Sequence, residues 1–151
     1  MLKVGRLADY GILILHHLGR VQPARLSMES ISELTHVPLP TVRKVMRFLA
    51  EAGLVISKRG PNGGYQIARP PAAINLAEAI AAVEGTTALT DCCGEAPDCE
   101  LMARCDLAGR WPGVNRIIMR VLERTSLADL DRFGETRTHI PPPLRDLLRS
   151  T

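Results

Sequence analysis

Aromatic side chains are scarce in this sequence, which has two phenylalanines, two tyrosines and one tryptophan among 151 residues. Proteins that hold single-stranded nucleic acid stack its bases on aromatic rings, so this scarcity argues against a single-strand binder. Long apolar runs are missing as well, and no stretch approaches the ~20 residues that a membrane span requires. The first six residues lack the apolar core of a secretory signal. We therefore expect a bacterial protein of the cytoplasm without a membrane partner.

Cysteine is confined to one short segment, since all four cysteines lie between Cys92 and Cys105. In a reducing compartment such a group predicts a metal or redox site before it predicts disulfides. A thiol enzyme fits less well. The sequence has no Cys-x2-Cys pair, the adjacent Cys92 and Cys93 bridge only with strain, and no nucleophile lies beside an obvious base. We expect that the protein is not an enzyme.

The overall composition is that of an ordinary globular protein, with 46% hydrophobic and 23% charged residues. The net charge of +3 permits nucleic-acid binding without requiring it. A chain of this length holds one domain with a real core, or a compact DNA-binding domain with an added helix.

The N-terminal half predicts a winged helix-turn-helix over residues 1–72. Apolar residues at helical spacing predict helices from Val4 to Leu18, from Ser27 to about Leu34, and from Pro38 or Leu39 to Gly53. Two β-prone runs follow, at 54–58 and 65–69, and the Asn62-Gly63 step between them favours a tight hairpin turn. The fold class is thus mainly α with a small β wing.

The C-terminal half predicts a helical extension. Asn75 and Glu78 form a capping-box-like start to a connecting helix in 73–90, and the cysteine loop follows at 91–110. Residues 111–130 form a long helix with one apolar stripe, which we expect to pack against its copy in a homodimer. Residues 131–151, which contain three consecutive prolines, are expected to be a flexible tail.

The outer face of the third helix and the wing are the candidate DNA-reading surface, because basic side chains suit guanine edges and phosphates. An arginine on a glycine-rich wing tip also suits the minor groove. The alternative is that these charges merely solvate an exposed helix face and an ordinary turn. The candidate contacts to double-stranded promoter DNA are Pro40, Thr41, Arg43, Lys44, Arg47, Lys58, Arg59, Gly60, Asn62, Gly63 and Tyr65.

Three of the cysteines, Cys93, Cys99 and Cys105, are evenly spaced, with five residues between neighbours. Even spacing in a loop lets three thiolates converge on one centre, and iron-sulfur clusters take thiolates in varied loops. Spacing alone leaves a structural zinc, a thiol redox switch and unligated thiols open.

Several motifs together resemble the IscR-like (Rrf-two) family of winged-helix iron-sulfur transcription regulators. They are the opening 7–11 (LADYG), the wing 58–65 (KRGPNGGY), the triple cysteine spacing, and Trp111 ahead of the long helix. The likeness extends through about Leu130, and the opening together with 126–130 (SLADL) is most similar to regulators of sulfur-mobilisation (SUF) cluster assembly. It implies a homodimer whose iron-sulfur cluster, held by Cys93, Cys99 and Cys105, governs binding to promoter DNA.

At the position of the fourth ligand, this chain differs from some members of that family. Some members have a histidine three positions after the third cysteine, where this chain has Ala108. The resemblance makes Asp9 the first candidate, because it matches an aspartate that completes the cluster from the partner subunit in nitric-oxide-sensing members. Cys92 is the second candidate. Asp9 is equally well explained as a charge that the helix dipole favours in a first turn, and both two-iron and four-iron clusters occur in the family.

The sequence therefore leaves three functions open. The first is a regulator that senses cluster status and controls cluster-assembly genes. The second is a nitric oxide or redox-sensing iron-sulfur repressor. The third is a zinc-stabilised DNA-binding module without redox sensing. In the first two, the cluster would fix the loop between the connecting helix and the long helix, and so set the spacing of the two reading heads.

Overall fold

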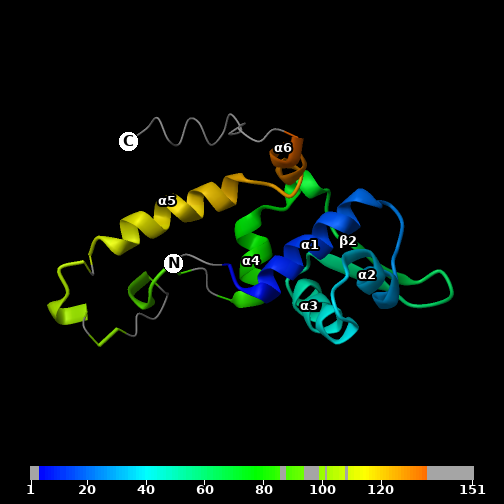
Figure 1. Ribbon diagram of the computed structural model, residues 1–151, viewed down its shortest axis with the longest axis horizontal. Coiled ribbons are helices and arrows are strands. Elements are labelled where there is room, and N and C mark those ends of the chain that lie inside the picture. Colours follow the sequence, from blue (N-terminus) through cyan, green and yellow to red (C-terminus); the bar gives the residue numbers. More distant parts are fainter. Residues whose placement is uncertain (1–3, 86–87, 94–98, 101, 108, 136–151) are drawn as a thin grey trace.

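The computed structural model describes residues 4–85, 88–93, 99–100, 102–107 and 109–135 (Figure 1). The N-terminal half contains α1 (Arg6–Arg20), α2 (Met28–Thr35), α3 (Leu39–Glu51), β1 (Val55–Lys58) and β2 (Gly64–Ile67). The rest contains η1 (Pro71–Ala73), α4 (Leu76–Glu84), η2 (Asp91–Cys93), η3 (Met102–Arg104), α5 (Trp111–Arg124) and α6 (Asp129–Glu135). The structure is mainly helical with one two-stranded antiparallel sheet, as the sequence predicted.

The core lies where α1, α3 and α4 pack together. The apolar stripe predicted for the third helix is confirmed, since α3 buries Val42, Val45, Met46 and Leu49 completely. Each such side chain contributes roughly 1.5–3 kcal/mol by leaving water. Gly11 is buried where α1 meets α4, and a Cβ there would lie 3.1 Å from the Val83 side chain. The core of the winged domain thus includes residues of the C-terminal half, among them Ile74, Ala79 and Leu127.

The first helix starts at Arg6 and continues through Gly19 to Arg20, two residues beyond the predicted end at Leu18. A Cβ at Gly19 would lie 2.6 Å from the Pro71 ring. Glycine at this position therefore lets η1 pack closely against the helix rather than stopping the helix.

The wing is a hairpin in which Val55 pairs with Ile67 and Lys58 with Gly64. Leu26 forms an isolated β-bridge beside β2, because its N–H and carbonyl both bond to the Tyr65 backbone at 2.9 and 2.8 Å. The loop runs from Arg59 to Gly63, and its positive φ angles fall at Gly60 and at Gly64 beside it rather than at Asn62. The tight turn between the strands is present, closed by the Gly63 N–H bonding to the Gly60 carbonyl at 2.8 Å, but its centre is at 61–62 rather than at Asn62-Gly63.

The connecting helix begins as predicted, with the Asn75 side chain accepting a hydrogen bond from the Glu78 N–H at 2.9 Å, and it ends at Gly85. The helix α5 projects away from the winged domain (Figure 1) and ends at Arg124 rather than at residue 130. It stops because the next residues return to the domain: Leu76 N–H bonds to the Thr125 carbonyl and Leu127 N–H to the Ile74 carbonyl, both at 2.9 Å.

The end of the described chain is helical. The helix α6 covers 129–135, so the predicted flexible tail does not begin at residue 131, and residues 136–151 lie outside the described part. Among the described residues no helix combines the length and the apolar character needed to cross a membrane.

Candidate functional site

The turn between α2 and α3 sets the angle of the candidate reading helix. The Ser27 side chain caps α2 by accepting from the Ser30 N–H at 3.0 Å. His36 ends α2 in the left-handed region with φ of 56°, and buried Val37 follows. Ser32 donates to the Val37 carbonyl at 2.7 Å, which ties the turn back to α2. Together these contacts form a helix-turn-helix.

The outer face of α3 is the cationic surface that the sequence predicted. Pro40, Arg43, Lys44 and Arg47 are exposed, and Thr41 near the helix start is half-buried. An α-helix fits the major groove, and these side chains project from the face opposite the buried stripe. The face can therefore meet DNA without disturbing the core.

Two of these cations have acidic neighbours that the sequence analysis did not identify. An Arg43 guanidinium nitrogen lies 3.8 Å from a Glu29 carboxylate oxygen on α2, and Arg47 Nε lies 3.8 Å from Glu51 on its own helix. All four side chains are more than 60% exposed. Such pairs contribute about 0–1 kcal/mol, so DNA phosphates can replace the carboxylates at small cost. The Arg47–Glu51 pair has an i,i+4 spacing that the sequence does contain.

The wing presents the second set of candidates. Lys58, Arg59, Gly60 and Asn62 are exposed, while Gly63 and Tyr65 are half-buried. A Cβ at Gly63 would lie 2.4 Å from the Lys58 carbonyl oxygen, so this loop requires glycine there. The compact loop holds the Arg59 backbone at the edge of the domain, where its side chain is free to approach a groove.

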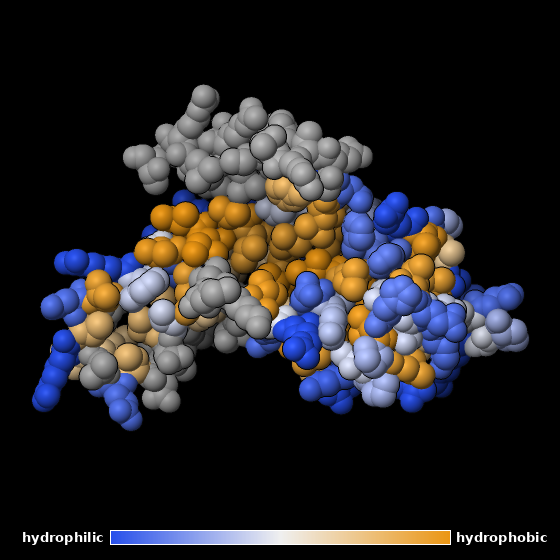
Figure 2. Space-filling model, in the orientation of Figure 1, coloured by the Kyte–Doolittle hydropathy of each residue, from blue (hydrophilic) through white to orange (hydrophobic). Residues whose placement is uncertain are grey.

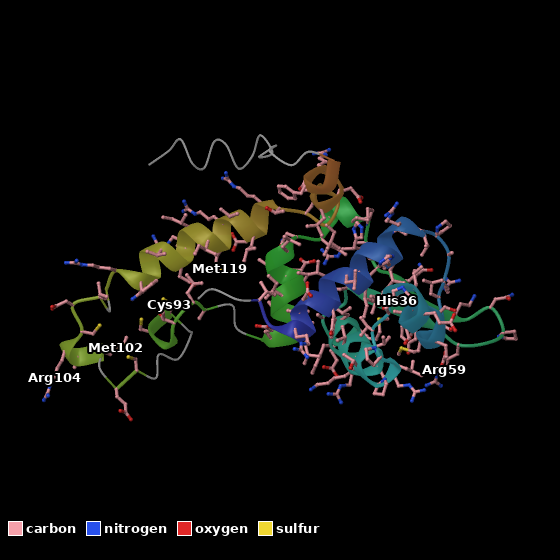
Figure 3. All side chains as sticks on the ribbon, viewed as in Figure 1. His36, Arg59, Cys93, Met102, Arg104 and Met119 are labelled. Carbon is pink, nitrogen blue, oxygen red and sulfur yellow. The ribbon has the colours of Figure 1, made fainter. Side chains whose placement is uncertain are left out.

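The cysteine loop is distant from this surface. Figure 3 shows Cys93, Met102 and Arg104 at one end of the molecule, and Arg59 and His36 toward the other. All four cysteines are free thiols; Cys92, Cys93 and Cys99 are half-buried and Cys105 is exposed. The chain therefore separates the predicted cluster site from the predicted DNA-reading surface.

The three predicted ligands are not gathered around one point in the part of the chain that the structure describes, where no three His, Cys, Asp or Glu side chains form a group able to hold a metal ion. Residues 94–98 and 108, which include the Ala108 position, lie outside that part. The chemistry of the donor set nevertheless fits an iron-sulfur cluster, because every thiol is free and none is sealed in the core.

Asp9, the first candidate for a fourth ligand, is exposed on α1 and does not join a cysteine group of its own chain among the described residues. It lines a groove of ≈ 360 Å³ between α1 and α6, together with Ile12, Leu13, His16, Leu130 and Asp131. Asp9 also lines a neighbouring hollow of ≈ 560 Å³ with residues 4–6. The carboxylate thus lies on an open surface.

The helix α5 has an unpartnered apolar face. It buries none of its residues, and Val114 and Ile117 are 44% and 52% exposed. Figure 2 shows apolar residues gathered along α5 and over the adjoining part of the molecule near α4 and α1. Monomeric proteins seldom expose contiguous apolar patches of large size, so this face has the character of an interface.

The chain matches a family model described as Rrf2, an iron-dependent transcriptional regulator, over residues 5–132. It is 30% identical over 134 residues to the protein rrf2 of Nitratidesulfovibrio vulgaris, which covers 87% of this chain and 88% of that protein. Among solved structures it is similar to CymR, the global cysteine regulator of B. subtilis, with a TM-score of 0.71 and 27% identity over 88% of this chain and 98% of that one. It is also similar to T. potens IscR, with a TM-score of 0.66 and 26% identity over 95% and 96% of the two chains. These relatives are transcription regulators rather than enzymes.

Proposed function

Because the chain belongs to the Rrf2 family of transcriptional regulators, we propose that it is a homodimeric regulator that binds promoter DNA and senses iron-sulfur cluster status. DNA-binding regulation is the activity of the family. The exposed cationic face of α3, together with the wing whose loop requires glycine, is the observation that assigns DNA binding to particular residues. We assign Arg43, Lys44 and Arg47 to the major groove and its phosphates, and Arg59 to the adjacent minor groove. Such a protein would work in the bacterial cytoplasm.

The proposed dimer would bury the apolar stripe of α5. A helix with no buried residue and an exposed Ile117 gains stability by packing against its copy. A two-fold arrangement would also present two reading helices to two half-sites of one promoter. Asp9 supports the same assembly, since its open groove could receive the cysteine loop of the other subunit.

The cluster would be held by Cys93, Cys99 and Cys105, with the partner subunit's Asp9 as the first candidate for the fourth position and Cys92 as the second. When bound, such a group supplies reversible one-electron chemistry and sensitivity to oxidants and nitric oxide. Binding of the cluster would change the position of α5, because the loop that carries the ligands joins α4 to α5. Ordering that loop would fix the angle of α5, and with it the spacing of the two reading helices.

Control of cluster-assembly genes is our first choice of target, on the strength of the resemblance to SUF regulators. The test is to purify the protein without oxygen, measure iron and sulfide per chain, and map the promoters it occupies in the cell. We expect a brown protein with visible absorption that occupies cluster-assembly promoters. Changing Cys93, Cys99 and Cys105 together to alanine should abolish the response of occupancy to iron starvation while leaving DNA binding in place.

The alternatives give different results in the same experiment. Occupancy of nitrosative-defence promoters, released by nitric oxide, would indicate a nitric oxide or redox-sensing repressor. A colourless protein with one zinc per chain would indicate a zinc-stabilised DNA-binding module. Unaltered occupancy in the triple variant under iron starvation and oxidative stress would refute the sensing half of the proposal.

A further inference from the structure

An acidic side chain of α2 lies beside the reading helix. Glu29 is in the first turn of α2, and one of its carboxylate oxygens is 3.8 Å from a guanidinium nitrogen of Arg43 on α3. Both side chains are more than 60% exposed, so the pair is open to an approaching duplex. The contact joins the two helices of the helix-turn-helix, and it places a negative charge where the protein meets a polyanion.

The cations of this surface are not all paired in the same way. Lys44, next to Arg43 in the chain, has no carboxylate partner among the described residues. Arg47 pairs with Glu51, also at 3.8 Å, but at the far end of α3. A recognition helix reads base edges with its N-terminal residues, and Arg43 is the arginine nearer to that end. The Glu29 pair therefore involves the arginine that is better placed to reach a base.

Stability does not account for this pair. The helix dipole favours an acidic residue in the first turn of α2, which explains the charge of Glu29 but not its neighbour on α3. An ion pair between two exposed side chains contributes little to folding. The effect of the pair on DNA binding is the larger one to consider.

An arginine can hold a carboxylate and a guanine edge at the same time. The guanidinium has five N–H donors in a rigid fork, so an ion pair at one terminal nitrogen of Arg43 leaves a full edge of the fork for the O6 and N7 acceptors of guanine. The guanine edge has no net charge, and the carboxylate does not repel it. A phosphate is an anion, and binding it to the same guanidinium brings two negative groups together. The carboxylate of Glu29 therefore opposes a phosphate contact and tolerates a base contact.

We propose that Glu29 is a positioning residue for sequence recognition, which keeps Arg43 from the phosphates and presents it to a guanine in the major groove. The proposal rests on the DNA-binding part of the proposed function and requires no cluster. Glu29 acts only through Arg43. Its carboxylate weakens binding to an arbitrary duplex more than binding to the correct site, and specificity is the difference between those two affinities.

The experiment measures DNA binding by the full-length chain and by E29Q, E51Q, R43Q and the double variant E29Q/R43Q. The specific probe is a duplex that the wild-type chain selects from a random-sequence pool, and the second probe is a shuffled duplex of the same composition. Titrations at several salt concentrations give both dissociation constants and the slope of log K against log salt. Glutamine keeps the size of glutamate without its charge. E51Q is the matched control, because it removes an equally exposed carboxylate at the same distance from the other arginine.

E29Q should bind the shuffled duplex about fivefold more tightly per subunit, with a salt slope steeper by about 1, because Arg43 gains one phosphate contact. Its preference for the selected duplex should fall roughly threefold, since the loss of a negative charge also favours that duplex slightly. A selection repeated with E29Q should relax one base pair of each half-site, the same one that R43Q relaxes. E51Q should tighten binding to both duplexes alike and keep the preference.

The proposal is overturned if E29Q and E51Q change the preference equally, or if E29Q lowers it as much in the R43Q background as in the wild type. Reduced thermal stability of E29Q with unchanged binding to both duplexes also refutes it, because Glu29 would then serve only the helix dipole. Each of these results leaves DNA binding itself intact. A wild-type chain that binds no duplex, or binds all duplexes alike, refutes the DNA-binding function and the proposal with it.

Discussion

The Leu89 N–H donates a hydrogen bond to the Asn115 side-chain oxygen at 3.1 Å and so joins the entrance of the cysteine loop to the middle of α5. The two residues lie 26 positions apart in the sequence. This bond is a direct connection between the segment proposed to carry the cluster and the helix proposed to form the dimer. It is therefore one contact through which a change in the loop would reach α5.

Replacing Asn115 with alanine should loosen that connection. Leu89 would lose its acceptor at a cost of about 1 kcal/mol, and the segment 88–93 would open more often. Hydrogen-deuterium exchange should show faster exchange of the Leu89 amide and unchanged exchange in α3. A matched control is Asn62→Ala, which removes the same side chain from the exposed wing loop. Unchanged exchange at Leu89 in N115A would refute the connection.

Replacing His36 with glycine should stabilise the protein. His36 has a φ of 56°, a left-handed conformation that costs a side chain roughly 1–2 kcal/mol and glycine very little. The greater freedom of glycine in the unfolded chain cancels part of the gain, which leaves up to about 1 kcal/mol. Urea unfolding measures the difference. The control H36A keeps the strained conformation, and the idea fails if H36A is as stable as H36G.

Removing charge from α3 and from the wing should weaken DNA binding in two distinguishable ways. Lys44→Ala should weaken binding to all duplexes alike and reduce the slope of log K against log salt by about 1, because one phosphate contact is lost. Arg59→Ala should cost about 1–3 kcal/mol and lower the preference for the specific site. Titrations at several salt concentrations measure both. Arg124→Ala, an equal change of charge at the end of α5, should leave both quantities unaltered.

Placing a charge in the apolar stripe of α5 should separate the subunits. Ile117→Asp would bury a carboxylate in the proposed interface and weaken the dimer by at least about a hundredfold. The monomer should remain folded, because Ile117 is 52% exposed in the single chain. Light scattering with circular dichroism checks both statements. Arg116→Gln makes the same change in net charge on the opposite helix face, and dissociation of both variants alike would contradict the assignment.

The anchoring of α6 should depend on pH through Asp129. Its carboxylate accepts from the Ser126 N–H at 2.9 Å and from the Ser126 hydroxyl at 2.7 Å. Burial alone would raise the pKa of Asp129, but these hydrogen bonds and the Arg132 charge outweigh it, so the pKa lies below its ordinary 3.8.

The stabilisation from this carboxylate is complete above pH 3.8 and is lost as the pH falls through the lower pKa of the folded state. D129N should therefore cost about 1 kcal/mol near neutral pH and should flatten the loss of stability below about pH 4. Unfolding measured from pH 7 to pH 3 tests this. An exposed control, Asp106→Asn, should leave the profile unchanged, and an unchanged profile in D129N would refute the assignment.

Local signals in the sequence were enough to place most of the winged domain. The buried stripe of α3, the Ser27 and Asn75 caps and the two strands each depend on residues within a few positions of one another, and all were found. The exposed positions of Arg43, Lys44 and Arg47 followed from the same helical periodicity. The comparisons then confirmed the family that the wing and cysteine motifs had indicated.

Contacts between distant segments decided the rest. The helix α5 ends at Arg124 because Thr125 and Leu127 bond to the backbone of residues 74–76, and no feature near Thr125 announces that pairing. Gly19 lies inside α1, where Pro71 packs too closely for a side chain, although a glycine near the end of a helical pattern favours a stop. The contact between Glu29 and Arg43 also required the observed turn between α2 and α3. Periodicity and capping belong to a single segment, so the sequence by itself determined the helices and strands of the winged domain and their buried faces, but not α6. The early end of α5 and the close packing against Gly19 depend on residues far away in the sequence. Only the tertiary structure brings those residues together.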